Sequence, residues 1–364
     1  MVPVANNEAI HKRVTIHDVA RECGLSATTV SKVLSKPERD LSMRPETIQH
    51  VRKMAERLGY QPNRFAQSLR LQQSKFIGIS QPSIIVDGKL VDMSLSPDLH
   101  THECYGIGLL LIGLTNCFNL AGYTTVYMPR SEHDDQLANP NQIYPDIVDG
   151  LLYMQPSYRH QEYLEIYEKN KNIVLLGRCP ENPRISSADI DNIDENHRLT
   201  KHLIHAGAEH ILMIMPSDEE NVAIRDRHLG YQAALKESGL PYHPEYILFQ
   251  GDNQHFEADI LEFLHGHGEI DAVITGAGPL TEMVIEACEK LNRRIPEDTL
   301  LAGFDITFKQ KYSSPMITSI EIPYFEMAKE SARILVEMIE HGNTAPVHTI
   351  LPATLSIRES SIRR

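Results

Sequence analysis

The sequence predicts a small all-α segment followed by a larger α/β domain, which has parallel sheets arranged in two lobes. Up to about residue 60 the apolar residues repeat at helical spacing, and from Ser74 onward short β-rich runs alternate with helical stretches. The net charge of the chain changes sign at the same point. Residues 1–74 hold 12 Lys/Arg and 7 Asp/Glu, whereas residues 75–364 hold 23 and 42. A basic segment on an acidic body is typical of a nucleic-acid-binding module joined to another domain.

Length and composition exclude several classes of protein. A chain of 364 residues is long enough for two or three domains at roughly 150 residues each. The five cysteines are widely spaced and form no Cys-x-x-Cys pair, which argues against a disulfide framework or a structural zinc site. The longest apolar stretch, residues 106–114, is too short to span a membrane, and the N-terminus is too polar for a signal peptide. We therefore expect a cytoplasmic, nucleoid-associated protein with no membrane partner.

The first helices carry clear boundary signals. Thr15-Ile-His-Asp18 is a capping pattern for a helix that should stop at Gly24, and Ser26 is a suitable N-cap for the next helix. Two short helices joined by a turn that contains glycine describe a helix-turn-helix. The outward face of the second helix carries small or polar side chains that suit a major groove, namely Ala27, Thr28, Thr29, Ser31 and Lys32. A third helix is predicted over residues 45–58.

Residues 14–34 and 58–70 resemble the DNA-binding headpiece of the lactose-repressor family. The resemblance implies an N-terminal extension over residues 1–13, a helix-turn-helix domain over 14–60, and a hinge helix and linker over 61–74. It adds Thr15 and Ser26 at the helix starts to the DNA-contacting set, with hinge contacts at Asn63 and Ala66. Leu69 falls where the family inserts a leucine wedge into the minor groove. Lys32 stands where many members carry arginine, so base discrimination there should differ.

The rest of the chain alternates between strand and helix patterns, which predicts parallel sheets covered by helices. About fifteen elements are too many for one sheet, so two lobes are expected. The predicted strands are 76–80, 124–128, 150–154, 173–176, 211–215, 246–249, 272–275 and 300–303. The predicted helices are 106–121, 160–170, 194–206, 227–238, 256–266, 280–291 and 324–341.

This part is similar to the periplasmic-binding-protein-like effector domain of the same family. The similar pieces include Asp149-Gly-Leu-Leu, Arg227-His-Leu-Gly-Tyr and Gly303-Phe-Asp. The resemblance implies an effector-binding and dimerisation domain over 75–364, with lobe 1 at about 75–190 and 323–346, and lobe 2 at about 192–319 and 350–364. We expect the chain to cross between the lobes near residues 190–192, 319–323 and 346–350.

The resemblance also places an effector site between the lobes. It makes Arg227 a clamp on a hydroxyl pair or carboxylate, Asp305 an acceptor for hydroxyls, and Tyr324 a stacking ring, with Asn192 close by. Where many members have an Asn-Asp pair, this chain has Gly276 and Ala277. A glycine-rich turn at a helix start favours an effector with a phosphate or carboxylate. The alternative is a tight turn that needs glycine for its backbone.

Residues 81–104 form an insertion relative to most members of the family. Val86-Asp-Gly-Lys carries a hairpin signal. Asp98, His100, His102, Glu103 and Cys104 match no standard metal-ligand spacing, so we predict neither a metal nor a cofactor. The helix that follows, residues 107–120, is apolar over a wide face. The family resemblance makes it part of a homodimer interface, and core packing is the alternative.

These features predict a homodimeric transcription regulator, acting as a repressor. Its partners would be double-stranded operator DNA and a small-molecule effector, namely a sugar, sugar phosphate or sugar acid. One alternative is a regulator of the same kind that answers to a nucleobase or a protein corepressor, and another is a solute-binding protein. An enzyme is not expected, because the sequence has no Gly-x-Gly-x-x-Gly after the first strand, no Walker A motif and no Gly-x-Ser-x-Gly.

Overall fold

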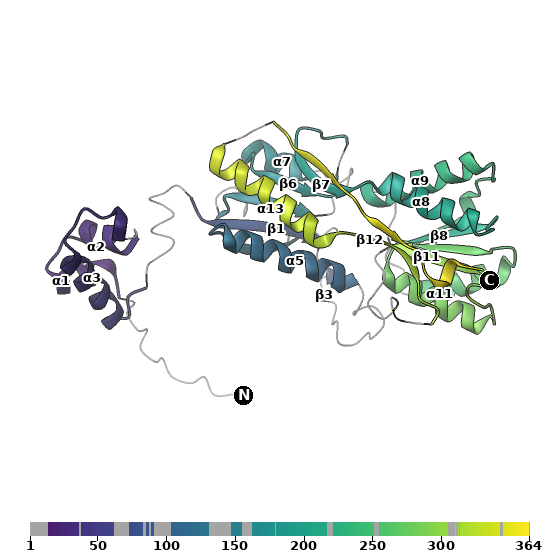
Figure 1. The fold of residues 1–364 in the computed structure, drawn as a ribbon, viewed down its shortest axis with the longest axis horizontal. Coiled ribbons are helices and arrows are strands. Elements are labelled where there is room, and N and C mark those ends of the chain that lie inside the picture. The colour runs from purple at the N-terminus through teal and green to yellow at the C-terminus, as the bar shows by residue number, and fades with distance from the viewer. Residues whose placement is uncertain are drawn as a thin grey trace, which may run out of the picture. The chain divides into compact units, whose positions relative to one another are not determined.

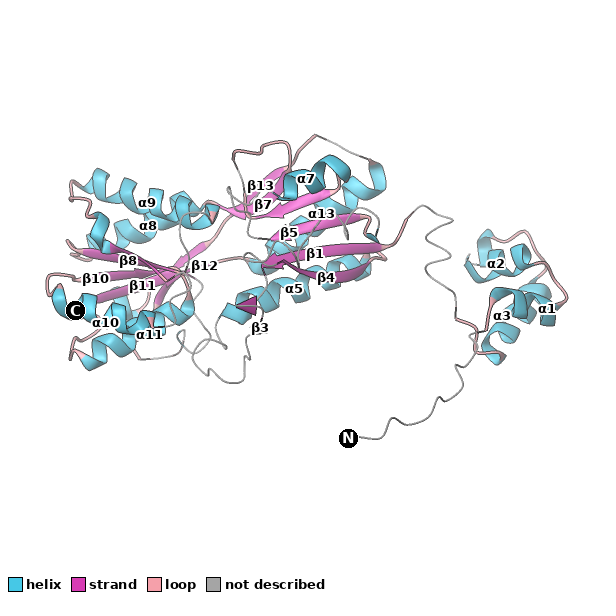
Figure 2. Cartoon of the chain, turned by 180° about the vertical axis from the view of Figure 1, so that it is seen from behind, coloured by secondary structure: helices cyan, strands magenta, loops and turns pink. Residues whose placement is uncertain are grey.

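The computed structural model divides the chain into two compact units, Met1–Ser74 and Lys75–Arg364. Each is described by itself (Figures 1 and 2). The structure describes residues 14–35, 38–61, 73–82, 85–86, 89–90, 103–130, 147–154, 162–178, 180–216, 221–250, 255–304, 310, 312, 314–342 and 345–363.

The first unit is helical, as the sequence predicts. Its elements are α1 (Ile16–Cys23), α2 (Ala27–Ser35), the short 3-10 helix η1 (Glu38–Asp40) and α3 (Pro45–Arg57). The three α-helices pack around a small apolar core of Val19, Ala20, Val30, Val33, Ile48, Val51 and Ala55. This core uses the apolar stripes that the helical spacing predicts.

The first helix is capped as expected. The Thr15 hydroxyl accepts the Asp18 backbone N–H, and the Asp18 carboxylate in turn accepts the Thr15 backbone N–H at 2.9 Å. These bonds satisfy donors that the helix start leaves unpaired. Gly24 closes the helix in the left-handed conformation, with φ 66°. Such a backbone favours glycine because a side chain there would be strained.

The second unit contains two six-stranded sheets. The first has the order β13-β7-β6-β5-β1-β4, and all its neighbouring strands are parallel. Its strands are β1 (Phe76–Pro82), β4 (Thr124–Arg130), β5 (Gly150–Met154), β6 (Ile173–Leu176), β7 (Ser186–Ile190) and β13 (His348–Leu351).

The second sheet has the order β14-β12-β11-β10-β8-β9 and is parallel except for the antiparallel pair β12–β14. Its strands are β8 (Ile211–Met215), β9 (Ile247–Phe249), β10 (Ala272–Thr275), β11 (Leu300–Phe304), β12 (Thr318–Glu321) and β14 (Thr354–Ser356). Two α/β lobes with parallel sheets are therefore present, as the sequence predicts.

Helices cover both faces of each sheet (Figure 2). The first lobe has α5 (Glu103–Leu120), α7 (Glu162–Lys169) and α13 (Tyr324–His341), and the second has α8 (Asn192–His205), α9 (Val222–Ser238), α10 (Phe256–Gly266) and α11 (Gly278–Lys290). Alternate residues of β8 show the two faces. Met213 packs in the cluster that contains α8 and α9, whereas Leu212 packs in the cluster that contains α10 and α11. Burial on both faces explains why these strands are continuous apolar runs.

The chain passes between the two sheets three times. It leaves the first sheet after β7, returns to the first lobe between β12 and α13, and leaves again between β13 and β14. The first two passages fall at the predicted positions. The third lies at residues 352–353, just beyond the predicted 346–350, because residues 348–351 form β13 of the first sheet.

The predicted hairpin is present as β2 (Ile85–Val86) paired antiparallel with β3 (Lys89–Leu90). Asp98, His100 and His102 lie outside the described residues, as do the side chains of Glu103 and Cys104. Among the described residues, no group of three or more His, Cys, Asp and Glu could hold a metal ion. Within the same described part of the chain, no helix is long and apolar enough to cross a membrane.

Candidate functional site

The outer surface of α2 is the first candidate site. Thr28 and Lys32 are exposed, and Ser31 is half-buried. The other two residues predicted for this face have structural contacts. Ala27 packs partly on the apolar core, and the Thr29 hydroxyl lies 2.8 Å from the Ser26 hydroxyl. The Ser26 Oγ also accepts the Thr29 backbone N–H at 3.1 Å, so Ser26 caps the helix.

Thr15 is exposed and lies at the start of α1, where it holds Asp18. Hydrogen bonds from its backbone N–H and its hydroxyl keep the pKa of the Asp18 carboxyl below its usual value. The anionic carboxylate faces the positive end of the helix, which adds to the cap. The predicted hinge residues Asn63, Ala66 and Leu69 lie outside the described residues.

The second candidate site centres on Arg227, in the second turn of α9, where only 7% of the residue is exposed. Its Nε donates to the Asn192 Oδ1 at 2.9 Å, and its Nη1 donates to the Gly276 carbonyl oxygen at 3.2 Å. The guanidinium carbon lies 4.0 Å from the centre of the Phe304 ring. Gly276 follows β10 and Phe304 ends β11, so the guanidinium lies at the carboxyl edge of the second sheet. This edge is where α/β proteins place ligands.

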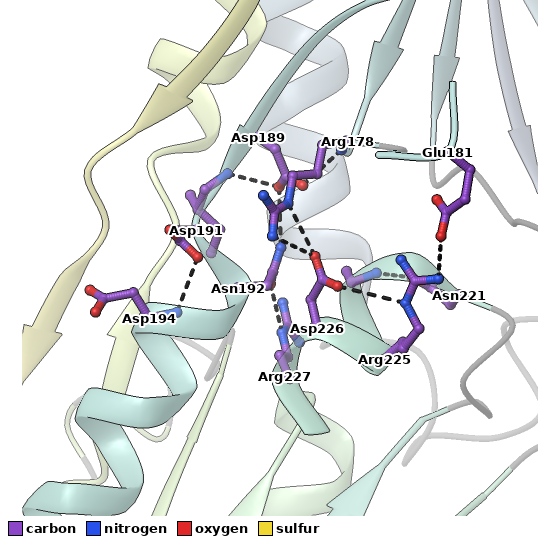
Figure 3. A network of polar contacts seen from close by, with 12 residues as sticks. Arg178, Glu181, Asp189, Asp191, Asn192, Asp194, Asn221, Arg225, Asp226 and Arg227 are labelled. Atoms are coloured by element: carbon purple, nitrogen blue, oxygen red, sulfur yellow. Dashed lines mark hydrogen bonds and ion pairs between the residues drawn. The ribbon is translucent and has the colours of Figure 1, made fainter. Parts of the chain in front are cut away.

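Asn192 joins Arg227 to the first lobe (Figure 3). It is the first residue of α8 and is buried, and its amide Nδ2 donates to the Asp189 Oδ1 at 3.3 Å. Asp189 belongs to β7 and also accepts the backbone N–H groups of Ile190 at 2.7 Å and Arg178 at 2.8 Å. Burial raises the pKa of Asp189 to about 6, against the opposing effects of these N–H groups and the nearby arginines.

An ion pair connects the lobes beside this site. The Arg178 guanidinium donates to the Asp226 Oδ2 through Nε at 3.1 Å and Nη2 at 2.9 Å. Arg178 follows β6 of the first lobe, whereas Asp226 precedes Arg227 in α9 (Figure 3). The Asp226 side chain is only 3% exposed and that of Arg178 is 28% exposed, so the carboxylate is the dehydrated partner of this pair.

The turn at Gly276 is tightly packed. A Cβ added there would lie 2.5 Å from the Met215 Sδ and 2.8 Å from the Pro216 Cδ. This close approach gives the glycine a packing reason that involves no anion. Ala277, at the N-cap of α11, is buried as well. The structure thus favours the tight-turn interpretation of Gly276.

The remaining predicted effector residues have different outcomes. Asp305 lies outside the described residues. Tyr324 begins α13 on the first lobe, directly after the second passage between the sheets, and packs partly against the main apolar core. The contacts above therefore bring together Arg227, Asn192 and Gly276 from the predicted set.

Sequence reasoning missed the carboxylates Asp189 and Asp226 and the cation Arg178. The available signals were weak. Asp189 is a carboxylate within a short polar run, Ser-Ser-Ala-Asp-Ile, just before a predicted passage between lobes, and Asp226 is adjacent to Arg227. The position of Asp226 does not reveal its partner Arg178, which lies 48 residues away in the sequence.

Comparison with known proteins finds a match for each of the two units. The sequence profile of the bacterial regulatory proteins of the lacI family matches residues 15–63, and that of the periplasmic binding protein-like domain matches residues 200–361. The chain is 27% identical to the HTH-type transcriptional regulator RegA of Clostridium saccharobutylicum, over 96% of this chain and 99% of the relative. It is 25% identical to catabolite control protein A of Priestia megaterium, over the same shares of the two chains.

Solved structures show the same fold. A lac repressor dimer bound to operator and an anti-inducer superposes with a TM-score of 0.79 at 19% identity, covering 97% of this chain and 100% of that chain. The transcriptional regulator CelR in complex with cellobiose gives 0.68 at 24% identity, covering 96% and 100%. The named relatives are transcriptional regulators and not enzymes. The chain thus combines a helix-turn-helix domain of the lacI family of bacterial regulatory proteins with a two-lobed periplasmic binding protein-like domain, and its homologues are regulators of the lacI type.

Proposed function

We propose that this DNA-binding regulator is a homodimeric repressor controlled by a sugar or sugar derivative bound at Arg227. The observation that carries the proposal is the placement of the buried Arg227 guanidinium between the Asn192 amide, the Gly276 carbonyl and the Phe304 ring. It lies at the carboxyl edge of a parallel sheet and next to the contacts that join the two lobes.

The chemistry of these groups fits a polyol. A guanidinium is a planar fork of donors that matches paired hydroxyl or carboxylate oxygens, and an amide can both donate and accept. The Phe304 ring is fully buried against the guanidinium and helps to hold it in place. The complex of CelR with cellobiose shows a similar fold with a disaccharide, which supports sugars as the first compounds to test.

The helical unit would read the operator through α2. Its exposed Thr28 and Lys32 and half-buried Ser31 form a polar surface of the kind that enters a major groove. We expect Leu69 and the other hinge residues to act in the minor groove, as the family resemblance implies.

The proposed dimer would use the outer face of α5. Leu110, Leu114 and Phe118 of this helix are buried in the lobe, whereas Leu109 is 41% and Ile112 is 62% exposed. Apolar side chains on both faces of one helix are typical of an element that packs against its own core and also against a partner.

Calorimetric titration of the full chain tests the effector proposal. The compounds are cellobiose, glucose, glucose 6-phosphate, gluconate and hypoxanthine. We expect saturable binding of at least one sugar compound, and loss of that binding in Arg227→Ala. Binding that survives Arg227→Ala unchanged would contradict the proposed site. Binding of hypoxanthine alone would replace the sugar class with a nucleobase.

The same titration separates the two interpretations of Gly276. Glucose and glucose 6-phosphate differ only in the phosphate, so a phosphate site at the start of α11 requires tighter binding of the ester. Equal affinity would leave only the tight-turn interpretation.

A further inference from the structure

At the start of α9, the side chains of Val222, Arg225 and Asp226 reach from the second lobe and contact the first. Together with their ion-pair partners in the first lobe, Arg178 and Glu181, they form a group that we name the α9 clasp. We propose that the clasp is a regulatory latch, which holds the lobes in the effector-binding arrangement and so sets operator affinity before any effector binds. The inference rests on the proposed effector control, because it assigns a regulation to that site.

The body of α9 belongs to the second lobe. The Tyr231 hydroxyl donates to the Ile211 carbonyl of β8 at 2.8 Å, and Asn196 of α8 donates to the Arg227 carbonyl at 2.7 Å. Gly230 lies so close to α8 that an added Cβ would lie 2.1 Å from the Ile193 carbonyl oxygen. The helix is therefore fixed to α8 and β8 and has to move with the second lobe.

The beginning of the same helix is anchored in the first lobe. Val222 is 2% exposed and packs in the apolar cluster that contains Tyr153, Tyr163 and Ile185. These partners come from β5, from α7 and from the residue before β7, all in the first lobe. Any separation of the lobes at this point would expose Val222 to water, which is unfavourable.

Two ion pairs accompany the apolar contact. Arg178 pairs with the buried Asp226, and the more exposed Glu181 accepts from the Arg225 Nη1 at 2.6 Å. The Arg225 Nε also lies 3.7 Å from the Asp226 Oδ1. An exposed pair contributes little, whereas removal of one partner from a buried pair leaves an uncompensated charge. Asp226 with Arg178 is therefore the pair that resists opening.

The clasp is connected to the proposed effector site by a continuous path. Asp189 accepts the Arg178 backbone N–H on one oxygen and the Asn192 amide on the other, and Asn192 accepts from Arg227. Arg227 is also the next residue after Asp226. A ligand that binds Arg227 and a substitution that breaks the clasp would therefore both act on the hydrogen bonds that join Arg178, Asp189 and Asn192 to Arg227 (Figure 3).

Linkage fixes the sign of the effect. If the effector binds the clasped arrangement more tightly, loss of the clasp must weaken effector binding and must move operator affinity in the direction opposite to the effector. Loss of a contact that contributes only to the stability of the fold is not expected to shift operator affinity in this particular direction.

The test uses two variants of the full chain. Arg178→Gln removes the ion pair with Asp226, and Val222→Ala removes part of the apolar contact with the first lobe. The matched control is Arg294→Gln, which removes an exposed ion pair with Asp298 in the second lobe. Hydrogen exchange is measured for peptides 177–190 and 222–228, with peptide 211–215 of β8 as an internal reference. Operator affinity is measured with and without cellobiose, glucose 6-phosphate and gluconate.

We expect exchange in both clasp peptides to become about tenfold faster in each clasp variant, with β8 and the control variant unchanged. We also expect operator affinity to shift opposite to the effector response of the wild type. Unchanged exchange in the clasp peptides overturns the latch, as does an operator shift in the same direction as the effector. Hydrogen exchange needs neither DNA nor ligand, so it tests the latch independently of the effector proposal. If none of the compounds changes the operator affinity of the wild type, the effector proposal is refuted by that result alone.

Discussion

Replacement of Arg227 with lysine keeps the positive charge at the proposed effector site but removes the planar fork. The guanidinium makes two hydrogen bonds in different directions, to Asn192 and to Gly276, and lies against the Phe304 ring. The lysine ammonium is a single point donor on a flexible stem. It can replace one of the two bonds and leaves the other buried acceptor without that donor.

The expected cost follows from these contacts. A hydrogen bond from a charged donor contributes about 1.5–3 kcal/mol, and one such bond is lost. The contact of the guanidinium with the ring adds about 1 kcal/mol. We therefore expect Arg227→Lys to lower the free energy of unfolding of the α/β unit by roughly 2–4 kcal/mol.

Urea unfolding followed by far-UV circular dichroism measures this loss, because the chain has no tryptophan to report by fluorescence. The control is Arg294→Lys in the exposed pair with Asp298. In parallel, the effector concentration for half response should rise at least about tenfold, since a bidentate contact is lost. A loss of stability below about 0.5 kcal/mol, with an unchanged effector response, would refute the role given to the guanidinium.

The remaining predictions concern the helical unit and Asp189. Thr15→Ala should destabilise α1 by about 1 kcal/mol, which amide exchange in the full chain measures; unchanged exchange would exclude a role for the cap. Lys32→Ala should reduce the ratio of specific to non-specific DNA affinity, whereas a uniform loss would make Lys32 a phosphate contact. Leu69→Ala should weaken specific binding far more than non-specific binding, and equal losses would argue against a wedge. The pKa of Asp189 is about 6 in the folded chain, above the usual 3.8 of an aspartate, so its stabilising effect is full below pH 3.8 and is lost as pH rises through 6. The wild type should therefore gain up to about 3 kcal/mol relative to Asp189→Asn between pH 7 and pH 4, and a constant difference would contradict the shift.

Local signals in the sequence were enough for most of the fold. The ends of α1 follow from Thr15, Asp18 and Gly24, because caps are formed by neighbouring residues. The strands β5 and β8 were predicted to the residue because both of their faces are covered and they read as apolar runs.

The strands that the sequence did not reveal are polar ones. The side chains of β7 find partners inside the protein: Ser187 contacts His348, and Asp189 accepts three N–H groups. In β12, which was expected as a passage between lobes, the Thr318 hydroxyl donates to the Arg358 carbonyl. A polar strand with satisfied hydrogen bonds has no alternating or apolar pattern to detect.

Only part of the candidate site could be predicted from the sequence. The resemblance to a family marked Arg227, Asn192 and Gly276, and the structure brings them together. The interlobe partners Arg178 and Asp226 depend on the way in which two lobes meet, and one sequence carries no information on contacts between residues so far apart.

The most direct test of effector control is fluorescence anisotropy of a labelled duplex from the DNA upstream of the gene. The full chain is titrated at one fixed salt concentration, with a scrambled duplex as the non-specific reference, because DNA affinity depends strongly on salt. Cellobiose, glucose 6-phosphate, gluconate and hypoxanthine are then added in turn. We expect specific binding that at least one sugar compound shifts by about tenfold, and no such shift in Arg227→Ala. Specific binding that none of the compounds changes, or a shift that persists in Arg227→Ala, would contradict control through this site.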